Sequence, residues 1–584
     1  MNIIKSDIEL GEYTPNVGTM FLNNRDAYKA SPAFAERRNG AYKYWSWEDL
    51  TNDIITLSAA LLNSGLDPDN DNLNRVSFIT GNSYQRLVCE MAVMSCGLVC
   101  VPIFARYPNP LMEKLIDFSD VCMLISDSAE KIFSLKPDCL PERVILLTPP
   151  QDETPKNPLV KVSYFDDILR RIPTKDTKAE IERHFRAVPP AALAMIMYTS
   201  GTSGLPKGVQ LHHSNIMSQQ KALEIMWKPE PGMRFLCYLP WHHSFGGLFE
   251  RFFALHSGGC LAIDDSFGKD INRLLENFDE IKPHAYFSVP VIYQSIVGKV
   301  LTSEKAEKTF FHDDLKFVFT AAAPLPLSTS DIFRKKEIPV VEAWGLTETS
   351  PCCTLTDFNM DRIPGIVGFP IPGVEMTLGQ DNELLVRGEN VMSGYFRNKK
   401  ATDKAFSDGG WFHTGDIGEI TAEGVKIISR KERMFKLSNG EKLFPSNIEE
   451  NVCRRCKFVK YAYVFGSGQK NPFMLIFPNS ELMAASVRNQ MDDPGCDFPR
   501  SCASLSSCLS SCVEEINTYQ LTGFERIGKA LVIQRELSLE ENELTPSFKL
   551  IPRRIEERYK TYIEAMQKEK YGNLPSDAYV IELD

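Results

Sequence analysis

Short apolar runs alternate with longer amphipathic stretches between residues 74 and 343. The runs are rich in Val, Ile, Phe and Tyr, which is typical of buried strands. They are Arg75–Thr80, Leu98–Ile103, Leu193–Tyr198, Arg234–Leu239, Ala285–Val289, Leu315–Phe319 and Val340–Glu342. Helical patterns lie between them, one ending near Met94 and others at Asn215–Met226 and Ile271–Phe278. This alternation predicts parallel β-sheets with helices on their faces.

The pattern changes after Gly365. Gly and Pro become frequent, and the runs Leu384–Arg387 and Val425–Ile428 predict antiparallel strands. Beyond Arg430 the chain mixes short helical and strand patterns with more charge. We therefore predict an α/β protein with two domains. Residues 1–430 would form a large N-terminal domain of stacked αβα subdomains plus a β-rich subdomain, and residues 431–584 a small α+β C-terminal domain.

The composition is that of a globular protein. Of 584 residues, 43% are hydrophobic and 24% charged, which excludes a disordered chain, a fibre and a coiled-coil rod. The net charge of −11 argues against a nucleic-acid-binding protein. Fifteen cysteines without a secretory signal predict reduced thiols and a cytoplasmic location. The most apolar stretch, Leu87–Phe104, contains Glu90 and is too interrupted to span a membrane, which leaves only a peripheral membrane contact open.

The strongest chemical signal is the segment Tyr198–Gly208, with the sequence YTSGTSGLPKG, directly after a predicted strand. Its glycines allow backbone N–H groups to point at an anion, and its hydroxyls and lysine add further donors. The segment therefore predicts a phosphate-binding loop. It is not a Walker A loop, because Lys207 is followed by Gly208 instead of Ser or Thr.

Further motifs follow this loop in order along nearly the whole chain. They are Leu239–Gly246, Ala321–Pro324, Trp344–Glu348, Gly394–Tyr395, Trp411–Asp416, Arg430–Arg433 and Leu544–Lys549. Together they resemble the motifs of the adenylate-forming superfamily, which contains acyl-CoA synthetases, adenylation domains and luciferases. Each motif alone is weak evidence, but their order and spacing make coincidence negligible.

The resemblance implies a reaction in two halves. The carboxylate of an acid attacks the α-phosphate of ATP to give acyl-AMP and pyrophosphate, and a thiol then forms the thioester and releases AMP. It implies ATP, Mg²⁺ and coenzyme A as cofactor and co-substrates. Such catalysis depends mainly on positioning and electrostatics, because charge builds on the phosphoryl oxygens and the leaving group.

The resemblance also implies nucleotide-binding roles for particular residues. The phosphate loop would bind the β- and γ-phosphates. Its residues in this role are Thr199, Ser200, Gly201, Thr202, Ser203, Gly204 and Lys207. Ala322, Ala323 and Pro324 would lie along adenine, and Trp344 and Gly345 would also contact the nucleotide.

A catalytic set follows from the same resemblance. Glu348, together with Thr199, would ligate Mg²⁺, since hard oxygen donors suit that ion. Thr347 would donate to the α-phosphate, and Lys549 would neutralise both the α-phosphate and the attacking carboxylate. His243, in the segment that resembles the acyl-pocket lining, completes the set.

The remaining implied roles concern the ribose and the second half-reaction. Asp416 would accept hydrogen bonds from the ribose hydroxyls, with Arg430 nearby. The small C-terminal domain would be mobile and rotate about a hinge at Glu432. Gly440 would let the pantetheine of coenzyme A pass close to the backbone.

The C-terminal lysine motif departs from the usual pattern of the superfamily. Phe548 precedes Lys549 where Gly is common, and Pro552 occupies the position three residues later where Arg is common. The arginines here are Arg553 and Arg554.

The identity of the acid follows less directly. The segment Trp241–Phe245 contains no acidic residue, so a buried substrate ammonium would lack a partner and an amino acid is disfavoured. Residues 437–442 and 544–547 resemble long-chain fatty acid–CoA ligases. Residues 239–247 and 258–265 resemble feruloyl-type enzymes. We predict an acid–CoA ligase for a medium- to long-chain fatty acid, with an aromatic hydroxycinnamate-type acid as the alternative.

Two further alternatives stay open at this stage. An acyl-AMP ligase could load an acyl carrier protein instead of coenzyme A, although the inserted motif of carrier-loading enzymes is absent between Asp416 and Arg430. A nucleotide- or lipid-binding protein without catalysis is more remote, because every catalytic position holds a competent residue.

The cysteines give no metal-binding signature. Cys496, Cys502, Cys508 and Cys512 do not have the spacing of a zinc ribbon, and Cys453 and Cys456 form a lone C-x-x-C in a predicted helix. We interpret them as reduced thiols, the first four in a surface insertion of the C-terminal domain.

Overall fold

The computed structural model describes most of the chain. The described residues are 3–149, 159–199, 206–321, 325–358, 362–363, 365–456, 458–479, 505–538, 541, 543–544, 550–572, 574–575 and 577–583. The chain folds into two compact units. The N-terminal unit comprises Met1–Leu378, Leu385–Thr414 and Ile420–Lys426, and the C-terminal unit comprises Gly379–Leu384, Gly415–Glu419 and Ile427–Asp584. The domain boundary between residues 430 and 431 stays a prediction.

The first sheet of the N-terminal unit has the order β20-β10-β9-β5-β4-β6-β7-β8. It is parallel from β9 to β8, whereas β10 pairs antiparallel with both β9 and β20. Its strands are β4 (Arg75–Ile79), β5 (Val99–Pro102), β6 (Met123–Ser126), β7 (Arg143–Leu146), β8 (Lys161–Tyr164), β9 (Leu193–Thr199), β10 (Lys207–His212) and β20 (Gly394–Tyr395). The predicted strands within residues 75–198 are confirmed here, and their parallel order confirms the predicted α/β class.

The second sheet has the order β17-β16-β15-β14-β13-β11-β12-β2-β3 and is parallel from β15 to β2. Its strands are β2 (Pro32–Arg38), β3 (Ala41–Ser46), β11 (Arg234–Cys237), β12 (Cys260–Ile263), β13 (Ala285–Ser288), β14 (Phe317–Thr320), β15 (Val340–Trp344), β16 (Thr354–Leu355) and β17 (Phe369–Pro370). Parallel strands are buried on both faces, which explains why the sequence shows continuous apolar runs here instead of alternation.

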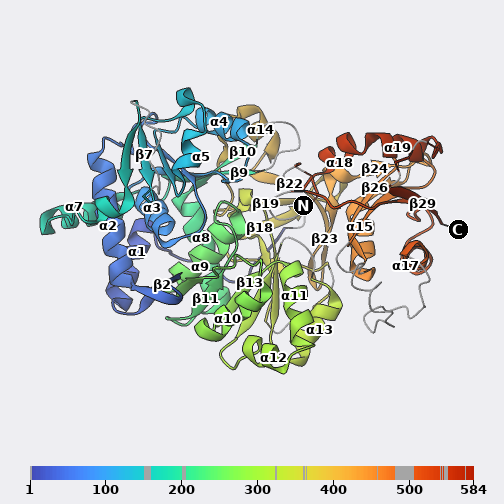
Figure 1. The fold of residues 1–584 in the computed structure, drawn as a ribbon, viewed down its shortest axis with the longest axis horizontal. Coiled ribbons are helices and arrows are strands. Elements are labelled where there is room, and N and C mark those ends of the chain that lie inside the picture. The colour runs from blue at the N-terminus through green and yellow to red at the C-terminus, as the bar shows by residue number, and fades with distance from the viewer. Residues whose placement is uncertain are drawn as a thin grey trace. The chain divides into compact units, whose positions relative to one another are not determined.

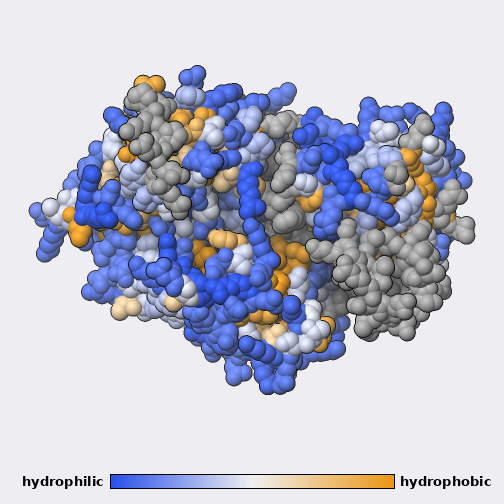
Figure 2. Space-filling model, viewed as in Figure 1, coloured by the Kyte–Doolittle hydropathy of each residue, from blue (hydrophilic) through white to orange (hydrophobic). Residues whose placement is uncertain are grey.

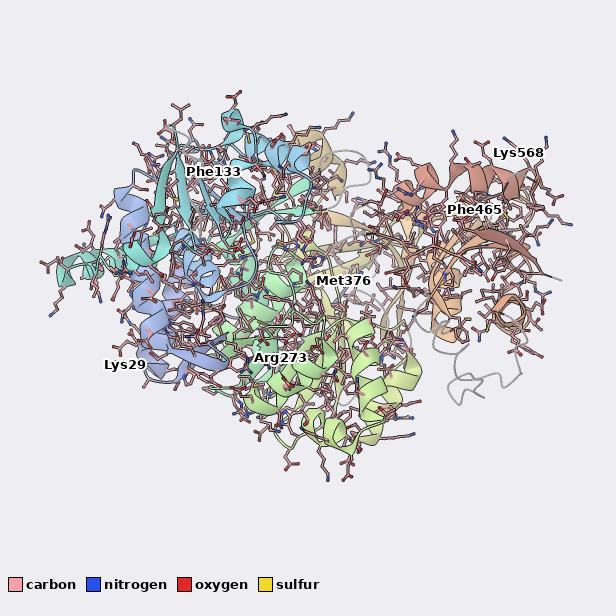
Figure 3. All side chains as sticks on the ribbon, in the orientation of Figure 1. Lys29, Phe133, Arg273, Met376, Phe465 and Lys568 are labelled. Carbon is pink, nitrogen blue, oxygen red and sulfur yellow. The ribbon has the colours of Figure 1, made fainter. Side chains whose placement is uncertain are left out.

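The third sheet is the β-rich part expected after Gly365. Its order is β1-β18-β19-β22-β21, with β23 beside β22. Its strands are β1 (Ile4–Lys5), β18 (Val374–Leu378), β19 (Glu383–Gly388), β21 (Phe406–Ser407), β22 (Trp411–Thr421) and β23 (Gly424–Arg430). Met376, labelled in Figure 3, pairs with Ile4 in antiparallel register.

Helices follow most of the parallel strands and cover the sheets. They are α1 (Val17–Tyr28), α2 (Trp47–Asn63), α3 (Tyr84–Ser95), α4 (Asn109–Phe118), α5 (Ala129–Phe133), α6 (Phe165–Leu169), α7 (Lys175–Ala187), α8 (His213–Trp227), the π-helix η2 (Phe245–Glu250), α9 (Arg251–His256), α10 (Ile271–Ile281), α11 (Pro290–Val300), α12 (Glu304–Phe310), α13 (Leu327–Lys335) and α14 (Lys399–Ala405). Figure 1 shows α10 to α13 gathered beside β13, and these helices pack against one another.

Sequence spacing explains individual helices. In α10, Leu274, Phe278 and Ile281 recur at helical spacing and are buried, so they form the face turned to the sheet. Asp270 caps the helix by accepting hydrogen bonds from the N–H groups of Asn272 and Arg273.

The C-terminal unit is built on a sheet of order β26-β27-β28-β29. Its strands are β26 (Val459–Phe465), β27 (Phe473–Pro478), β28 (Lys529–Ile533) and β29 (Ala578–Glu582), accompanied by β24 (Phe435–Lys436), β25 (Lys442–Leu443), α15 (Pro445–Arg455), α17 (Leu505–Tyr519), α18 (Pro552–Arg558) and α19 (Lys560–Gln567). Alternate residues of β26 serve two separate cores. Val464 packs with α15 and α17, whereas Phe465, labelled in Figure 3, packs with α18 and α19.

The cysteine interpretation is wrong in one respect. Cys512 is buried in the core of the C-terminal unit, because α17 places Leu509, Val513 and Ile516 on one apolar face. This helix is therefore part of the fold and not a surface insertion. Cys453 lies on α15 as expected, and burial raises its pKa to about 12, so its thiol stays protonated. Cys496 and Cys502 lie outside the described residues.

Two observations concern the exterior. Among the described residues, every helix is too short or too polar to cross a bilayer. Hydrophilic side chains cover most of the face drawn in Figure 2.

Candidate functional site

The phosphate-loop motif connects two paired strands. Thr199 ends β9 and Lys207 begins β10, and the two residues are register partners in this antiparallel pair. The Thr199 hydroxyl lies 3.5 Å from the Lys207 carbonyl oxygen. The predicted loop residues between them, which are Ser200, Gly201, Thr202, Ser203 and Gly204, lie outside the described residues, as do Ala322, Ala323, Pro324 and Lys549.

Strand β20 extends this hairpin and brings a tyrosine to it. Tyr395 pairs with Val209 on β10. Because side chains alternate along a strand, Lys207 and Val209 share one face, so Tyr395 is a diagonal neighbour of Lys207. The Lys207 ammonium accordingly lies 4.8 Å from the centroid of the Tyr395 ring.

Glu348 contacts the hydroxyl of the same tyrosine. It belongs to the 3₁₀-helix η3 (Thr347–Thr349), which follows β15. The Tyr395 hydroxyl donates to Glu348 Oε1 at 2.8 Å, and the Met392 N–H donates to the Glu348 carbonyl oxygen at 2.8 Å. The structure thus brings the predicted phosphate ligand Lys207 and the predicted Mg²⁺ ligand Glu348 to one place.

The turn between β15 and η3 depends on a glycine. A Cβ atom at Gly345 would lie 1.9 Å from the carbonyl oxygen of Pro351, so no side chain fits there. Trp344, half-buried at the end of β15, accepts a hydrogen bond from the Cys353 N–H at 2.9 Å. These contacts fix the direction in which Thr347 and Glu348 leave the sheet.

Thr347 is joined to the segment that the sequence associates with the acid. Its hydroxyl donates to the Ser244 hydroxyl at 3.1 Å. The neighbouring His243 accepts from the Gly247 N–H at 2.7 Å through its carbonyl oxygen, which ties it to the start of η2. Thr347 therefore contacts the segment that carries His243, through the neighbouring Ser244.

The two adjacent histidines have different surroundings. His242 stacks on Phe104 with ring centroids 4.3 Å apart, and burial holds its pKa well below the ordinary value, so this ring is neutral. The segment that carries both histidines is anchored by Asn82, which lies just before α3. Asn82 donates to the Leu239 carbonyl oxygen at 2.8 Å and accepts from the Trp241 N–H at 3.1 Å.

An aromatic cluster fills the space beyond Ser244, between η2 and the second sheet. The ring centroid of Phe249 lies 4.6 Å from that of Phe319 and 5.8 Å from that of Trp227. The centroids of Phe245 and Phe319 are 5.6 Å apart. All four side chains are buried. The segment therefore packs against a buried core that is apolar and aromatic.

One carboxyl group is buried at the end of η2. Glu250 is 1% exposed, and its Oε2 has no hydrogen-bond partner among the described residues. Burial raises its pKa well above the ordinary value, so the side chain is a neutral acid. It cannot serve as a counter-charge for a substrate ammonium while it stays protonated.

The predicted ribose ligand lies in the C-terminal unit. Asp416 on β22 is 3% exposed, and Arg430 Nε on β23 lies 2.7 Å from its Oδ1. In the preceding position, the Gly415 N–H donates to Glu383 Oε1 at 3.1 Å, and Lys431 Nζ lies 2.8 Å from Glu383 Oε2. The two strands thus hold Asp416 and Arg430 as a charged pair.

The two residues predicted for the second half-reaction also lie in this unit. Glu432 is exposed on the short 3₁₀-helix η5 (Lys431–Arg433). Gly440 has a φ of +85° in the turn between β24 and β25, and a Cβ there would meet nothing within 4 Å. Its backbone conformation, not crowding, therefore favours glycine.

The arrangement in the N-terminal unit suits a nucleotide. An ammonium group on Lys207 and hydroxyls on Thr199 and Thr347 are donors for phosphate oxygens. The half-buried carboxylate of Glu348 is the hard oxygen donor that Mg²⁺ prefers, and this ion is usually held by one or two carboxylates plus substrate phosphates. The donor set therefore fits a magnesium nucleotide.

Sequence reasoning assigned no role to Tyr395 or Ser244, although both lie in motifs that it identified. Tyr395 contacts Lys207 and Glu348, and Ser244 contacts Thr347. The pairing of β20 with β10 reveals the first contact, and that pairing has no local signal in the sequence.

Comparison with known proteins assigns the chain to a family. The family described as AMP-binding enzyme matches residues 22–396, and the AMP-binding enzyme C-terminal domain matches residues 432–570. Long chain acyl-CoA synthetase 2 of Arabidopsis thaliana is 25% identical, over 91% of this chain and 88% of the relative. Long-chain-fatty-acid–CoA ligase 5 of Rattus norvegicus is also 25% identical, over 90% and 85%.

Solved structures share the fold. ATP-bound MatB from Rhodopseudomonas palustris superposes with a TM-score of 0.71 at 20% identity, over 94% of this chain and 99% of that chain. The o-succinylbenzoate CoA synthetase MenE from Bacillus subtilis, in complex with an acyl-adenylate, gives 0.69 at 18% identity, over 93% and 98%. These likenesses confirm the fold class with a large N-terminal and a smaller C-terminal part.

Proposed function

The chain belongs to the AMP-binding enzyme family, and on that premise we propose that it is an ATP- and Mg²⁺-dependent acid–CoA ligase. The observation that carries the proposal is the meeting of Lys207, Thr347 and Glu348 around Tyr395 and Ser244. An ammonium, a hydroxyl and a carboxylate that lie close together are what a magnesium nucleotide requires.

In the first half-reaction, an oxygen of the acid forms a bond to the α-phosphorus of ATP while the bond to the pyrophosphate oxygen breaks. Lys207 and Thr199 hold the β- and γ-phosphates, and Thr347 donates to the α-phosphate. Glu348 holds Mg²⁺, which when bound neutralises negative charge on the phosphates. Lys549 is the proposed partner of the α-phosphate and the attacking carboxylate.

Asp416 and Arg430 serve the nucleoside. A buried carboxylate that already accepts from one arginine keeps further lone pairs for hydroxyl donors. We therefore assign the ribose hydroxyls to Asp416, with Arg430 fixing the orientation of the carboxylate.

In the second half-reaction, the thiol of coenzyme A attacks the acyl carbonyl and AMP leaves. Gly440 presents an open backbone surface, which supports its assignment to the passage of pantetheine. Glu432 is the proposed hinge, and the cytoplasmic location is proposed from the reduced thiols.

The proposed acid is a medium- to long-chain fatty acid. The names of the relatives support this class, and the surroundings of the Ser244 segment are apolar, since the rings of the cluster around Phe249 pack beside it. The same aromatic rings also suit an aromatic acid, which stays the second candidate.

The test is acid-dependent release of pyrophosphate and AMP with a panel of fatty and hydroxycinnamic acids, in the presence and absence of coenzyme A. We expect pyrophosphate release with a fatty acid, and acyl-CoA only when coenzyme A is added. Lys207→Ala should abolish pyrophosphate release, whereas Lys221→Ala, a lysine on α8 that pairs with Glu224, should not. The proposal would be contradicted if none of the acids in the panel supported pyrophosphate release, or if a thioester formed only on a carrier protein.

A further inference from the structure

Tyr395 is held by its backbone in a single direction. It is 7% exposed and pairs with Val209 on β10. Its N–H donates to the Thr402 hydroxyl at 2.9 Å, and its carbonyl oxygen accepts from the Asn398 N–H at 3.1 Å. Because the residue is restrained on several sides, its ring has a defined place between β10 and η3.

The hydroxyl of Tyr395 acts on one oxygen of Glu348. A phenol has a single proton to donate, and here it is given to Oε1 at 2.8 Å. A hydrogen bond to one carboxylate oxygen restrains the orientation of the group and leaves the second oxygen as the natural contact for a cation. Restricting the rotation of a side chain when a metal binds costs free energy. The hydrogen bond already restricts the rotation of Glu348, so this cost is reduced.

The ring of Tyr395 acts on Lys207. The ammonium lies 4.8 Å from the ring centroid, within the range of a cation–π interaction. Among the described residues, Lys207 and Glu348 form no direct ion pair with each other, although one contacts the ring and the other the hydroxyl of the same side chain. A direct pair would occupy both charges, whereas a tyrosine that contacts both holds each in place and keeps it able to bind a ligand.

We propose that Tyr395 is a positioning residue that couples nucleotide binding to Mg²⁺ binding, by orienting Glu348 through its hydroxyl and Lys207 through its ring. This inference rests on the proposed function, because it takes Glu348 as the Mg²⁺ ligand and Lys207 as a phosphate ligand. It assigns the hydroxyl and the ring to different ligands, so the two parts can be removed separately.

The experiment measures ATP binding by calorimetry with saturating Mg²⁺ and with excess EDTA. Tyr395→Phe removes only the hydroxyl. We expect it to reduce the Mg²⁺-dependent gain in ATP affinity by about tenfold, the effect of one hydrogen bond to a charged group, and to leave ATP affinity in EDTA unchanged. Tyr395→Leu removes the ring as well and should also weaken ATP binding in EDTA.

The matched control is Tyr84→Phe. Tyr84 is also buried, and its hydroxyl donates to a carboxylate, Asp53 Oδ2, at 2.7 Å on α2. The change removes the same kind of hydrogen bond outside the site, so it should leave ATP affinity unchanged under both conditions. Thermal unfolding of each variant establishes that it is folded.

A double-mutant cycle with Glu348→Gln gives an independent readout. If Tyr395 acts through Glu348, Tyr395→Phe should have no further effect on Mg²⁺-linked ATP affinity once Glu348 is replaced. An unchanged Mg²⁺-linked affinity in Tyr395→Phe, or an equal effect in both backgrounds, overturns the inference. Failure of the wild-type protein to release pyrophosphate with any acid overturns the proposed ligase function instead, since the binding cycle does not depend on an acid.

Discussion

Arg430 Nε lies 2.7 Å from Asp416 Oδ1, and the two residues come from the neighbouring strands β23 and β22. Asp416 is almost fully buried, whereas about half of the Arg430 side chain is exposed. The arginine therefore supports a carboxylate that has little contact with water. Removing such a partner leaves a buried charge uncompensated, which costs free energy and allows the carboxylate to change its orientation.

Arg430→Ala should weaken ATP binding. Hydrogen bonds to charged groups contribute about 1.5–3 kcal/mol, so the dissociation constant of ATP should rise by about tenfold to a hundredfold. Arg430→Lys should lose less ATP affinity than Arg430→Ala, because lysine keeps the positive charge although it lacks the planar guanidinium donor. The control is Arg273→Ala, which breaks an arginine–aspartate pair with Asp265 in the other unit (Arg273 is labelled in Figure 3). Equal ATP affinity in Arg430→Ala and the wild type would refute the ribose assignment of Asp416.

Gly345→Ala should be poorly tolerated. Its new Cβ would lie 1.9 Å from the Pro351 carbonyl oxygen, so the turn that carries Thr347 and Glu348 must shift. Overpacking of this kind costs about 1–3 kcal/mol of the free energy of unfolding. Gly298→Ala, in α11 with nothing within 4 Å of its Cβ, should stabilise the protein by about 0.5–1 kcal/mol. Urea unfolding of the two variants measures the difference, and similar values for both would show that the crowding at Gly345 is relieved easily.

The parallel sheets could be predicted from sequence because buried strands give continuous apolar runs. Three of the predicted runs correspond to central strands of these sheets, namely residues 75–80, 193–198 and 285–289. The contact between Lys207 and Tyr395 could not be predicted, because it depends on the pairing of β10 with a two-residue strand far along the chain.

The error at Cys512 has a different cause. The Ser- and Cys-rich composition suggested a surface segment, yet Leu509, Val513 and Ile516 follow a helical period in the same residues. The periodicity was the better signal, because a helix needs only one apolar face to become part of a core.

The choice between fatty and aromatic acids can be tested at Phe249. This side chain lies in η2, one turn beyond Phe245, with its ring 4.6 Å from Phe319. If the acid enters this cluster, Phe249→Leu should increase kcat/KM for the longer fatty acids of a chain-length series relative to the shorter ones. Phe253→Leu is the matched control, because Phe253 lies in the same cluster but one turn farther from Ser244. Parallel changes for all chain lengths in the Phe249 variant would place the acid elsewhere.

The buried Glu250 predicts an unusual pH dependence of stability. Burial raises its pKa well above the ordinary value of 4.5, so the folded protein keeps the proton over a range of pH in which the unfolded chain releases it. The folded state then binds more protons than the unfolded state, and the free energy of unfolding falls as pH rises above about 4.5. Glu250→Gln keeps the shape and removes the titration. The variant should therefore gain stability relative to the wild type as pH is raised from 4.5 towards 8.

Urea unfolding at a series of pH values measures this difference, and the midpoint of the N-terminal unit is the quantity to follow. Glu276→Gln serves as the control, because Glu276 is exposed on α10 and pairs with Arg273 at the surface. A stability difference between Glu250→Gln and the wild type that stays constant from pH 4.5 to pH 8, or that falls as pH rises, would show that Glu250 is ionised in the folded protein. In that case a cation must reach it, and the end of η2 would have to be considered as a charged subsite instead of an apolar one.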